Sequence, residues 1–399
     1  MTSTELSPSS RQWRTICAPP EQLNEVRGSE RGWHTGPVRV MVAMSGGVDS
    51  SVAAAMLVEQ GHEVVGATLK LWGGESDSGC CSVADVEDAR RVAQQLGIMH
   101  HVFNLTEEFD RRVVTPYVSE HERGRTPNPC IECNRTIKFD RLLRRADRLG
   151  FDRLATGHHA RVTRVGRGGN GPGRDGPTRL ELRRGADVAK DQSYVLSMLG
   201  QDELSRVLFP VGAMTKDQVR AHARRLGLRT AGKPDSQDVC FIGSTVGRGG
   251  FLGERMALHR ADVVDTEGRP AGMVEAVELV TVGQRRGMGH GQDGKRRYVR
   301  AVDVAERRVV VGTAEDVLRS SVHLPTPSVT WVDRPLLTGA RAVVQVSAHA
   351  RPVPCTVDVD ENGVVVRFDA PQRPVAPGQT VALYDAVDPD AVVGAGIAS

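Results

Sequence analysis

Three cysteines and one glycine-rich stretch carry the residue types that could do chemistry in this chain. Cys130 and Cys133 form a Cys-x-x-Cys pair, and Cys240 ends the charged stretch 233–240. The stretch 45–50 reads Ser-Gly-Gly-Val-Asp-Ser. Thiolates are nucleophiles and metal ligands. Glycines and hydroxyls before a helix can bind a phosphate group. The sequence therefore points to phosphate binding combined with thiol or metal chemistry.

The glycine-rich stretch lies where a phosphate-binding loop is expected. The apolar run 38–44 before it has the length of a buried strand, and residues 52–60 after it predict a helix that stops at Gly61. The stretch has neither a Gly-Lys-Ser/Thr ending nor the G-x-G-x-x-G fingerprint. It resembles the SGGxDS pyrophosphate loop of N-type ATP pyrophosphatases, which use ATP to adenylate an oxygen and release pyrophosphate. An ordinary strand-to-helix turn is the alternative.

The Cys-x-x-Cys pair lies between two prolines and a basic stretch. Pro127 and Pro129 predict an extended, rigid loop. We expect a basic amphipathic helix from Asn134, its cap, to Leu149, so that Cys133 precedes the helix. A helix N-terminus favours the thiolate form of a cysteine. A zinc half-site and inert thiols are the alternatives, and the sequence has no second Cys-x-x-Cys pair.

The remaining cysteines and the composition favour a reduced, cytoplasmic protein. The seven cysteines of this 399-residue chain are too irregular for a disulfide scaffold. No secretory signal or membrane-spanning run is visible. Net charge is only +3, but residues 111–167 carry 14 Lys or Arg against 6 Asp or Glu. This basic stretch indicates a nucleic-acid face, with solvated helix faces as the alternative.

Alternating strands and helices from residue 38 to 156 predict a parallel α/β sheet with helices on both faces. Residues 161–184 predict a hairpin, 190–228 return to helix, and short alternating strands dominate beyond 247. The expected domains are a disordered extension at 1–37, a catalytic pyrophosphate-loop domain at 38–246, a small mixed central domain at 247–312 and a C-terminal β-barrel at 313–399.

Eight collinear stretches resemble the bacterial tRNA-specific 2-thiouridylases, enzymes that place sulfur on C2 of the wobble uridine of certain tRNAs. The resemblance runs from about Val38 to the C-terminus. It rests on AMSGGVDSSVAA at 43–54, CCS at 80–82, TPNPCIECNRTIKF at 126–139, ATGHHAR at 155–161, KDQSYVLSML at 190–199, LFPVGAMTKDQVR at 208–220, KPDSQDVCFIG at 233–243 and TVGQRRGMG at 281–289.

The resemblance implies a role for each matching residue. The nucleophile falls on Cys133 and the persulfide-carrying cysteine on Cys240. The predicted ATP contacts are Ala43, Met44, Ser45, Gly46, Gly47, Val48, Asp49, Ser50, Leu69 and Gly157. The predicted tRNA contacts are Asn128, Pro129 and Cys130 at the target uridine, Lys190, Asp191 and Gln192 elsewhere, and the central domain. Cys80 and Cys81 receive no role.

Two chemical routes remain open under this resemblance. In the first, ATP with Mg²⁺ adenylates the C2 oxygen and a Cys240 persulfide delivers sulfur, while Cys133 forms a disulfide with Cys240 or frees sulfide from it. In the second, Cys130, Cys133 and Cys240 hold a [4Fe–4S] cluster. Both imply tRNA and an external sulfur donor, such as a cysteine desulfurase relay, as partners of a cytoplasmic monomer.

Two rival functions remain. One is a pyrophosphate-loop synthetase that aminates or ligates a small molecule, which would not need the loop cysteines. The other is a non-catalytic tRNA-binding protein with a structural zinc, which would leave the Ser-Gly-Gly-Val-Asp-Ser loop unexplained.

Overall fold

A computed structural model describes residues 36–72, 82–166, 179–235, 239–243, 245–291 and 293–399 of the chain. The predicted extension at 1–37 lies almost wholly outside these residues, and so do Cys80 and Cys81. Residues Val38–Ser399 form one compact unit. All statements below concern the described part of this unit.

The first sheet is parallel, as the alternating pattern of strands and helices predicted. Its strand order is β3-β2-β1-β4-β7. Neighbouring strands run parallel throughout. The strands are β1 (Arg39–Ala43), β2 (Glu63–Lys70), β3 (Met99–Asn104), β4 (Arg153–Thr156) and β7 (Val207–Leu208). The order changes direction at β1, where the doubly wound topology opens a crevice at the strands' carboxyl ends. The glycine-rich loop follows β1 at this point.

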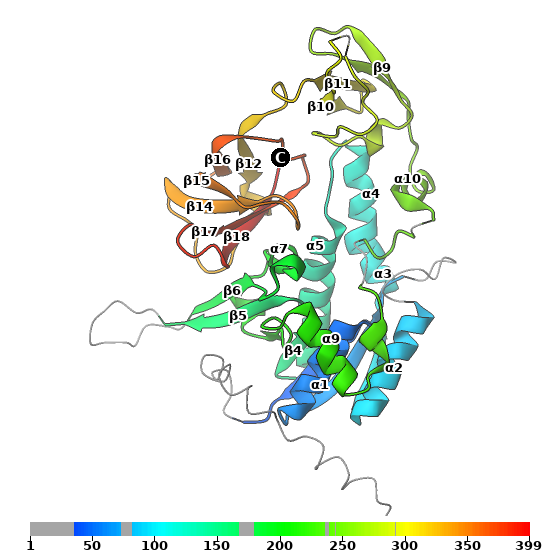
Figure 1. The fold of residues 1–399 in the computed structure, drawn as a ribbon, viewed down its shortest axis with the longest axis vertical. Coiled ribbons are helices and arrows are strands. Elements are labelled where there is room, and N and C mark those ends of the chain that lie inside the picture. The colour runs from blue at the N-terminus through cyan, green and yellow to red at the C-terminus, as the bar shows by residue number, and fades with distance from the viewer. Residues whose placement is uncertain (1–35, 73–81, 167–178, 236–238, 244, 292) are drawn as a thin grey trace, which may run out of the picture. The chain divides into compact units, whose positions relative to one another are not determined.

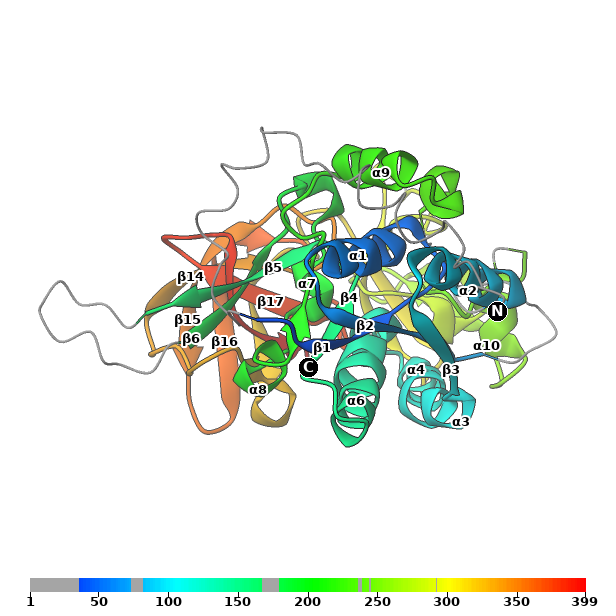
Figure 2. The same ribbon diagram turned by 90° about the horizontal axis from the view of Figure 1, so that it is seen from below.

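Helices cover both faces of this sheet, as the alternating pattern predicted. Figure 2 shows α1 (Val48–Glu59), α2 (Val83–Leu96) and α9 (Lys216–Arg225) on one face, and α3 (Thr106–Phe109), α4 (Thr115–Glu122) and α6 (Leu143–Arg148) on the other. Buried side chains of β1, α1, α2 and α9 form one apolar core, which includes Val40, Val52, Ala89 and Val219. This burial fixes α1, and with it the loop that precedes it.

The remaining helical segments connect these elements. A π-helical turn, η5 (Asp110–Val114), joins α3 to α4, and a second, η6 (Asn134–Leu142), joins α5 (Pro129–Cys133) to α6. The region 190–228, predicted as helical, contains the two-residue strand β7 as well as short helices, and helical turns lie at both of its ends. These helices are η7 (Val188–Lys190), α7 (Ser193–Leu196), α8 (Gln201–Leu204), α9 and η8 (Arg229–Gly232).

A second, smaller sheet follows helix α10 (Gly247–Gly253) in the central region (Figure 1). Its order is β10-β11-β8-β9. The elements are β8 (Ala261–Val264), β9 (Pro270–Val274), η9 (Val277–Leu279), β10 (Tyr298–Asp303) and β11 (Arg308–Gly312). Its core is separate from that of the first sheet and contains Val263, Val277, Val299 and Val309. The predicted mixed segment after residue 247 is therefore present.

The third sheet combines the C-terminal strands with a hairpin from the parallel-sheet region. The path of this nine-stranded sheet is β12-β16-β15-β14-β17-β18-β6-β5, and β13 pairs with β18. The predicted hairpin is β5 (Ala160–Val165) with β6 (Arg179–Arg184), and β6 joins β18. The others are β12 (Arg319–Pro325), η10 (Thr326–Ser328), β13 (Thr330–Trp331), β14 (Ala340–Gln345), β15 (Val353–Val359), β16 (Gly363–Gln372), β17 (Thr380–Asp385) and β18 (Ala391–Ile397).

The described residues thus form an α/β parallel-sheet region, a central β region and a C-terminal β-barrel. This confirms the predicted fold class. No described helix is long and apolar enough to cross a membrane. The domain boundaries stay predictions, and the β6–β18 pairing carries one sheet across the predicted boundary at 313.

The barrel core supplies a stability test. Leu383 is completely buried among the apolar side chains of the third sheet. Leu383→Ala is expected to lower the free energy of unfolding by about 2–5 kcal/mol, because it removes buried methyl groups and leaves a cavity. Leu337→Ala is the matched control, since the Leu337 side chain is 82% exposed, and its effect should be about 0.5 kcal/mol or less. Chemical denaturation measures both; equal effects would contradict this burial.

Candidate active site

The glycine-rich loop forms a tight turn between β1 and α1. Gly46 has a positive φ of 74°, and a Cβ there would lie 2.3 Å from the backbone oxygen of Asp85. The Ser50 hydroxyl donates to the Gly47 carbonyl (3.2 Å) and accepts from the Ser45 N–H (3.2 Å). Gly47 occupies the N-cap position of α1, and no side chain there accepts a hydrogen bond from the first N–H groups of the helix. Backbone donors at the start of α1 therefore remain suited to a phosphate group.

The other predicted ATP contacts lie on the strands beside this loop. Gly157 follows β4 and packs directly on the loop, since a Cβ there would lie 2.5 Å from the Ser50 nitrogen. Leu69 is buried near the end of β2, the neighbour of β1. The Met44 N–H donates to the Ala67 carbonyl (2.8 Å), which holds the loop entrance against β2. The structure thus brings the predicted ATP contacts to one end of the parallel sheet, where their role stays a prediction.

The Asp49 carboxylate of this loop contacts two side chains, those of Lys216 and His159. It accepts from Lys216 Nζ (2.7 and 2.8 Å) and from His159 Nε2 (3.0 Å). Burial raises the pKa of Asp49, but the hydrogen bonds from His159 and Lys216 outweigh it and hold the pKa below its ordinary value. No role for Lys216 was predicted from the sequence, although it lies in a stretch that carries the resemblance.

His158, the residue before His159, is buried. Its Nδ1 lies 2.7 Å from Thr156 Oγ1. Burial lowers the pKa of His158 well below its ordinary value, and nearby Lys138 and His159 lower it further. The ring is therefore neutral near pH 7.

A pH titration of stability tests this neutrality. Below pH ~6.5 the unfolded chain protonates this ring and the folded chain does not, so stability falls as pH falls. We expect up to about 1.4 kcal/mol per pH unit from this residue. The free energy of unfolding, measured with denaturant at several pH values between 7 and 5, should fall less steeply with decreasing pH for His158→Asn than for the wild type. An unchanged dependence on pH would contradict a neutral His158 in the folded chain.

The Cys-x-x-Cys pair lies inside the first turns of a helix, which corrects the prediction that a helix begins at Asn134. The helix starts at Pro129, and the Asn128 side chain caps it by accepting from the N–H groups of Cys130 (3.0 Å) and Ile131 (3.3 Å). Helical backbone then continues through η6 and α6. Proline is favoured at the first helical position because its missing N–H is not needed there. Cys130, not Cys133, is therefore next to the helix start.

The two cysteines of this pair differ in burial and in their neighbours. Cys133 is only 8% exposed, whereas Cys130 is half-buried. The backbone N–H of Val239 donates to Cys130 Sγ (3.4 Å). This contact brings the chain segment that carries Cys240 next to the pair, although the two are far apart in sequence.

The described segment beside Cys240 is held on its other side by aromatic side chains. Phe241 is 4% exposed, and its ring packs on those of Phe109 (5.5 Å), Tyr117 (5.7 Å) and Phe251 (5.2 Å between centroids). Val239 has a φ of 55°, a strained conformation for a β-branched residue. Such strain persists only where surrounding contacts hold the backbone, and it gathers at functional sites.

The predicted tRNA contacts at 190–192 have internal partners. The Asp191 carboxylate accepts from Arg184, the Gly185 N–H, and both the N–H and the hydroxyl of Ser193. Gln192 Oε1 accepts from the His159 N–H (2.9 Å). Lys190 pairs with Asp235 (2.8 Å). Their tRNA role stays a prediction, while the Gln192 contact holds His159, which itself contacts Asp49 of the glycine-rich loop.

No three His, Cys, Asp or Glu side chains of the described residues lie together in a way that could hold a metal ion. In this conformation Cys130, Cys133 and Cys240 thus do not fit a shared metal cluster.

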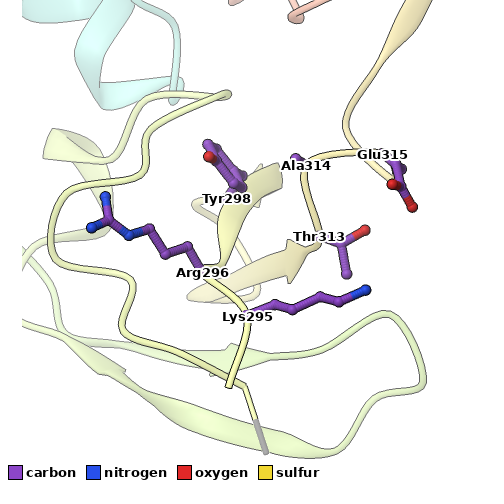
Figure 3. A pocket seen from close by; sticks show the side chains of 6 residues that line it. All are labelled: Lys295, Arg296, Tyr298, Thr313, Ala314 and Glu315. Carbon is purple, nitrogen blue, oxygen red and sulfur yellow. The ribbon is translucent and has the colours of Figure 1, made fainter. Parts of the chain in front are cut away.

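The central region has a cavity of about 230 Å³, which is lined by Lys295, Arg296, Tyr298, Thr313, Ala314 and Glu315 (Figure 3). It shares no residue with the predicted site.

A parallel sheet whose strand β1 leads into the glycine-rich loop 45–50 defines a nucleotide-binding domain of the pyrophosphate-loop class. Family models match along the chain in order: the tRNA methyl transferase HUP domain at 38–244, the tRNA methyl transferase PRC-barrel domain at 249–313 and the aminomethyltransferase beta-barrel domain at 322–398.

Curated relatives narrow this class to one family. The tRNA-specific 2-thiouridylase MnmA of Roseiflexus sp. is 46% identical over 90% of this chain and 98% of its own length. That of Geobacter metallireducens is 44% identical over 90% and 96%. The chain belongs to the tRNA-specific 2-thiouridylase family, as the sequence motifs predicted.

Solved structures match about half of the chain at low similarity. The U34-tRNA thiolase NcsA from Methanococcus maripaludis with its [4Fe–4S] cluster is 17% identical, covers 54% of this chain and 62% of its own, and has a TM-score of 0.32. A 4-thiouridine synthetase in complex with RNA and ATP is 16% identical, covers 51% and 45%, and also has a TM-score of 0.32. Likeness at this level does not bear on the site.

Proposed function

We propose that this chain is an ATP-dependent tRNA sulfurtransferase that places sulfur on C2 of the wobble uridine. Membership of the 2-thiouridylase family supports the reaction class. One observation carries the proposal for the site: the segment that includes Cys240 contacts both halves of the machinery. Lys233 Nζ donates to the Gly46 carbonyl of the ATP loop (3.0 Å), and the Val239 N–H donates to Cys130 Sγ (3.4 Å).

The first step is activation of the uridine. ATP transfers its AMP group to the C2 oxygen and releases pyrophosphate, which turns that oxygen into part of a good leaving group. The start of α1 and the loop 45–50 would bind the departing pyrophosphate through backbone donors. The uridine must leave the base stack to reach this site. Asn128, Pro129 and Cys130 are the proposed contacts of the extruded base.

The second step is sulfur transfer. The outer sulfur of a Cys240 persulfide bonds to C2, and AMP departs with the oxygen. The Cys133 thiolate then attacks the Cys240 sulfur, which breaks the sulfur–sulfur bond, leaves the sulfur on the uridine and forms a Cys133–Cys240 disulfide. A dithiol reductant restores both thiols. In the variant order, Cys133 attacks first and frees hydrosulfide, which then adds to C2.

Two inorganic groups enter this proposal differently. Mg²⁺ binds proteins chiefly through substrate phosphates and one or two carboxylates, and Asp49 is the carboxylate of the ATP loop that could take part. When bound, Mg²⁺ neutralises charge on the departing pyrophosphate. The described cysteines do not fit a [4Fe–4S] cluster in this conformation. We therefore derive no step through a cluster.

The partners follow from the chemistry of the proposed reaction. tRNA is the substrate, and the basic residues 111–167 are the proposed phosphate contacts, together with Arg285 and Arg286 of the central region. The persulfide must come from a sulfur donor, such as a cysteine desulfurase relay. A cytoplasmic location and a monomeric state remain part of the proposal.

The test is direct assay of the product. Purified chain is incubated with tRNA, ATP and a persulfide-bearing protein or inorganic sulfide, and nucleosides are analysed by mass spectrometry. We expect 2-thiouridine at the wobble position, strict dependence on ATP, and pyrophosphate released with each thiolation. ATP-dependent modification of a small molecule instead, or tRNA binding without thiolation under all these conditions, would refute the proposal.

A further inference from the structure

Lys216 connects the ATP loop to the segment around Cys240. Its Nζ lies 2.7 Å from Asp49 Oδ2 and 3.0 Å from Asp235 Oδ1. The Lys216 side chain is only 11% exposed. One buried ammonium therefore joins two carboxylates, one in the ATP loop and one that precedes Cys240 by five residues in the sequence. We call residues 233–235 and 239–243 the Cys240 arm.

Asp235 anchors this arm through ion pairs with three cationic side chains. Besides Lys216, its carboxylate contacts Arg220 NH2 (2.7 Å) and Lys190 Nζ (2.8 Å). Burial raises the pKa of Asp235, but hydrogen bonds from Lys190 and Lys216 outweigh it and lower the pKa far below its ordinary value. Charge-assisted hydrogen bonds are stronger than neutral ones. Asp235 is thus a fixed anion among three cations.

Lys233 forms a second connection, two residues earlier. Its Nζ donates to the Gly46 carbonyl (3.0 Å) and pairs with Asp85 and Asp88 of α2. Asp85 itself packs against Gly46 through its backbone. Arg220 NH1 also donates to the Lys233 carbonyl (2.9 Å). The arm therefore reaches the ATP loop through two side chains on either side of Pro234.

The far end of the arm lies against the thiol pair. The Val239 N–H contacts Cys130 Sγ, and Phe241 is buried among aromatic rings. Residues 233 and 235 thus connect the arm to the ATP loop, and Val239, next to Cys240, connects it to the Cys-x-x-Cys helix. A fastening at both ends limits where the Cys240 sulfur can move.

We propose that Asp235 is a positioning residue, which through Lys216 ties the Cys240 arm to the ATP loop so that sulfur is delivered to the carbon that ATP has activated. This inference rests on the proposed function, since it assigns a role within that reaction. The adenylated carbon must lie at the ATP loop, and the sulfur must reach it before water hydrolyses the adenylate. Small errors of placement are costly, because a shift of about 1 Å can cost about 10²-fold in rate.

The experiment measures how many 2-thiouridines form for each pyrophosphate released. Asp235→Asn keeps the size of the side chain and removes its charge. We expect this variant to release pyrophosphate within about threefold of the wild type and to form at least about tenfold fewer 2-thiouridines per pyrophosphate, because adenylates hydrolyse while they wait for sulfur. Asp235→Glu should recover part of this ratio, since it restores the charge.

The matched control is Asp217→Asn, which removes a charge from an exposed neighbour of Lys216 on α9. It should keep the wild-type ratio. Two results would overturn the inference: a wild-type ratio in Asp235→Asn, or equal loss of pyrophosphate release and thiolation, which would place Asp235 in ATP binding or folding. Failure of the proposed function itself is recognised separately, because the wild-type chain would then form no 2-thiouridine.

Discussion

Cys240→Ala is expected to abolish 2-thiouridine formation while ATP-dependent pyrophosphate release continues. Removing the residue that carries the reacting sulfur should lower thiolation by at least about 10³-fold, as losses of covalent nucleophiles do. Activation needs only the ATP loop and the uridine, so pyrophosphate release should stay within about tenfold of the wild type. Mass analysis of nucleosides measures the first quantity and a coupled phosphate assay the second.

Two further variants make this result interpretable. Cys133→Ala should block thiolation in the same way, because both proposed orders of sulfur transfer need its thiol. Cys355→Ala is the matched control: Cys355 is completely buried in the barrel core, and burial raises the pKa of its thiol to about 11, so it stays neutral. It should retain thiolation. Full activity of Cys133→Ala and Cys240→Ala would exclude the two-thiol relay.

Gly157→Ala is expected to inactivate the ATP site. A Cβ at this position would lie 2.5 Å from the Ser50 nitrogen, 2.6 Å from the Asp49 carbonyl carbon and 2.9 Å from Asp49 Cβ. Two of these three atoms are backbone, so the loop itself must shift. Because phosphate binding depends on the aim of the loop's N–H groups, pyrophosphate release should fall by at least about 10²-fold. The KM for ATP should rise in the same assay.

Gly232→Ala is the matched control for this change. No atom lies within 4 Å of a Cβ built at Gly232, and it belongs to the 3-10 segment η8 rather than to the ATP loop. We expect unaltered pyrophosphate release and an unaltered KM. Near wild-type kinetics of Gly157→Ala would mean that the loop tolerates the displacement and that Gly157 is not part of a tight nucleotide site.

Local pattern predicted the elements that carry the ATP loop. The apolar run at 38–44 became β1, and the helix predicted after the loop became α1, which begins at Val48 rather than at residue 52. These predictions succeeded because buried parallel strands and their connecting helices have distinct apolar periodicities. The loop between them has a turn chemistry that few other structures share.

The predicted start of the Cys-x-x-Cys helix was wrong because two local sequence signals compete there. Two prolines in Thr126-Pro127-Asn128-Pro129 favour extended backbone for the residues before them, which suggested a longer loop. Asn128 followed by proline is also the preferred beginning of a helix. The second signal prevails in the structure, where Ile131 and Cys133 are buried on the helix. This places Cys130, and not Cys133, at the helix start.

The ionic contacts of Asp49 were beyond the reach of sequence reasoning. Lys216 and Asp235 lie far from Asp49 in the chain, and charged residues of their type are mostly solvated. Only the packing of α9 against α1 brings Lys216 to the ATP loop. The same holds for the hairpin β5–β6, whose existence was predicted but whose pairing with β18 was not.

By itself, the sequence determined the parallel α/β sheet, the glycine-rich loop after its first strand, the β-rich C-terminal part and the motif order of the 2-thiouridylase family. These depend on periodicity and on residue types at short spacing, which are local properties of the chain. The tertiary structure alone decided which distant charges meet, and so how the segment around Cys240 is held between the ATP loop and Cys130. Such contacts arise only when separate elements pack together, because no local pattern records which charged side chains will share a desolvated position.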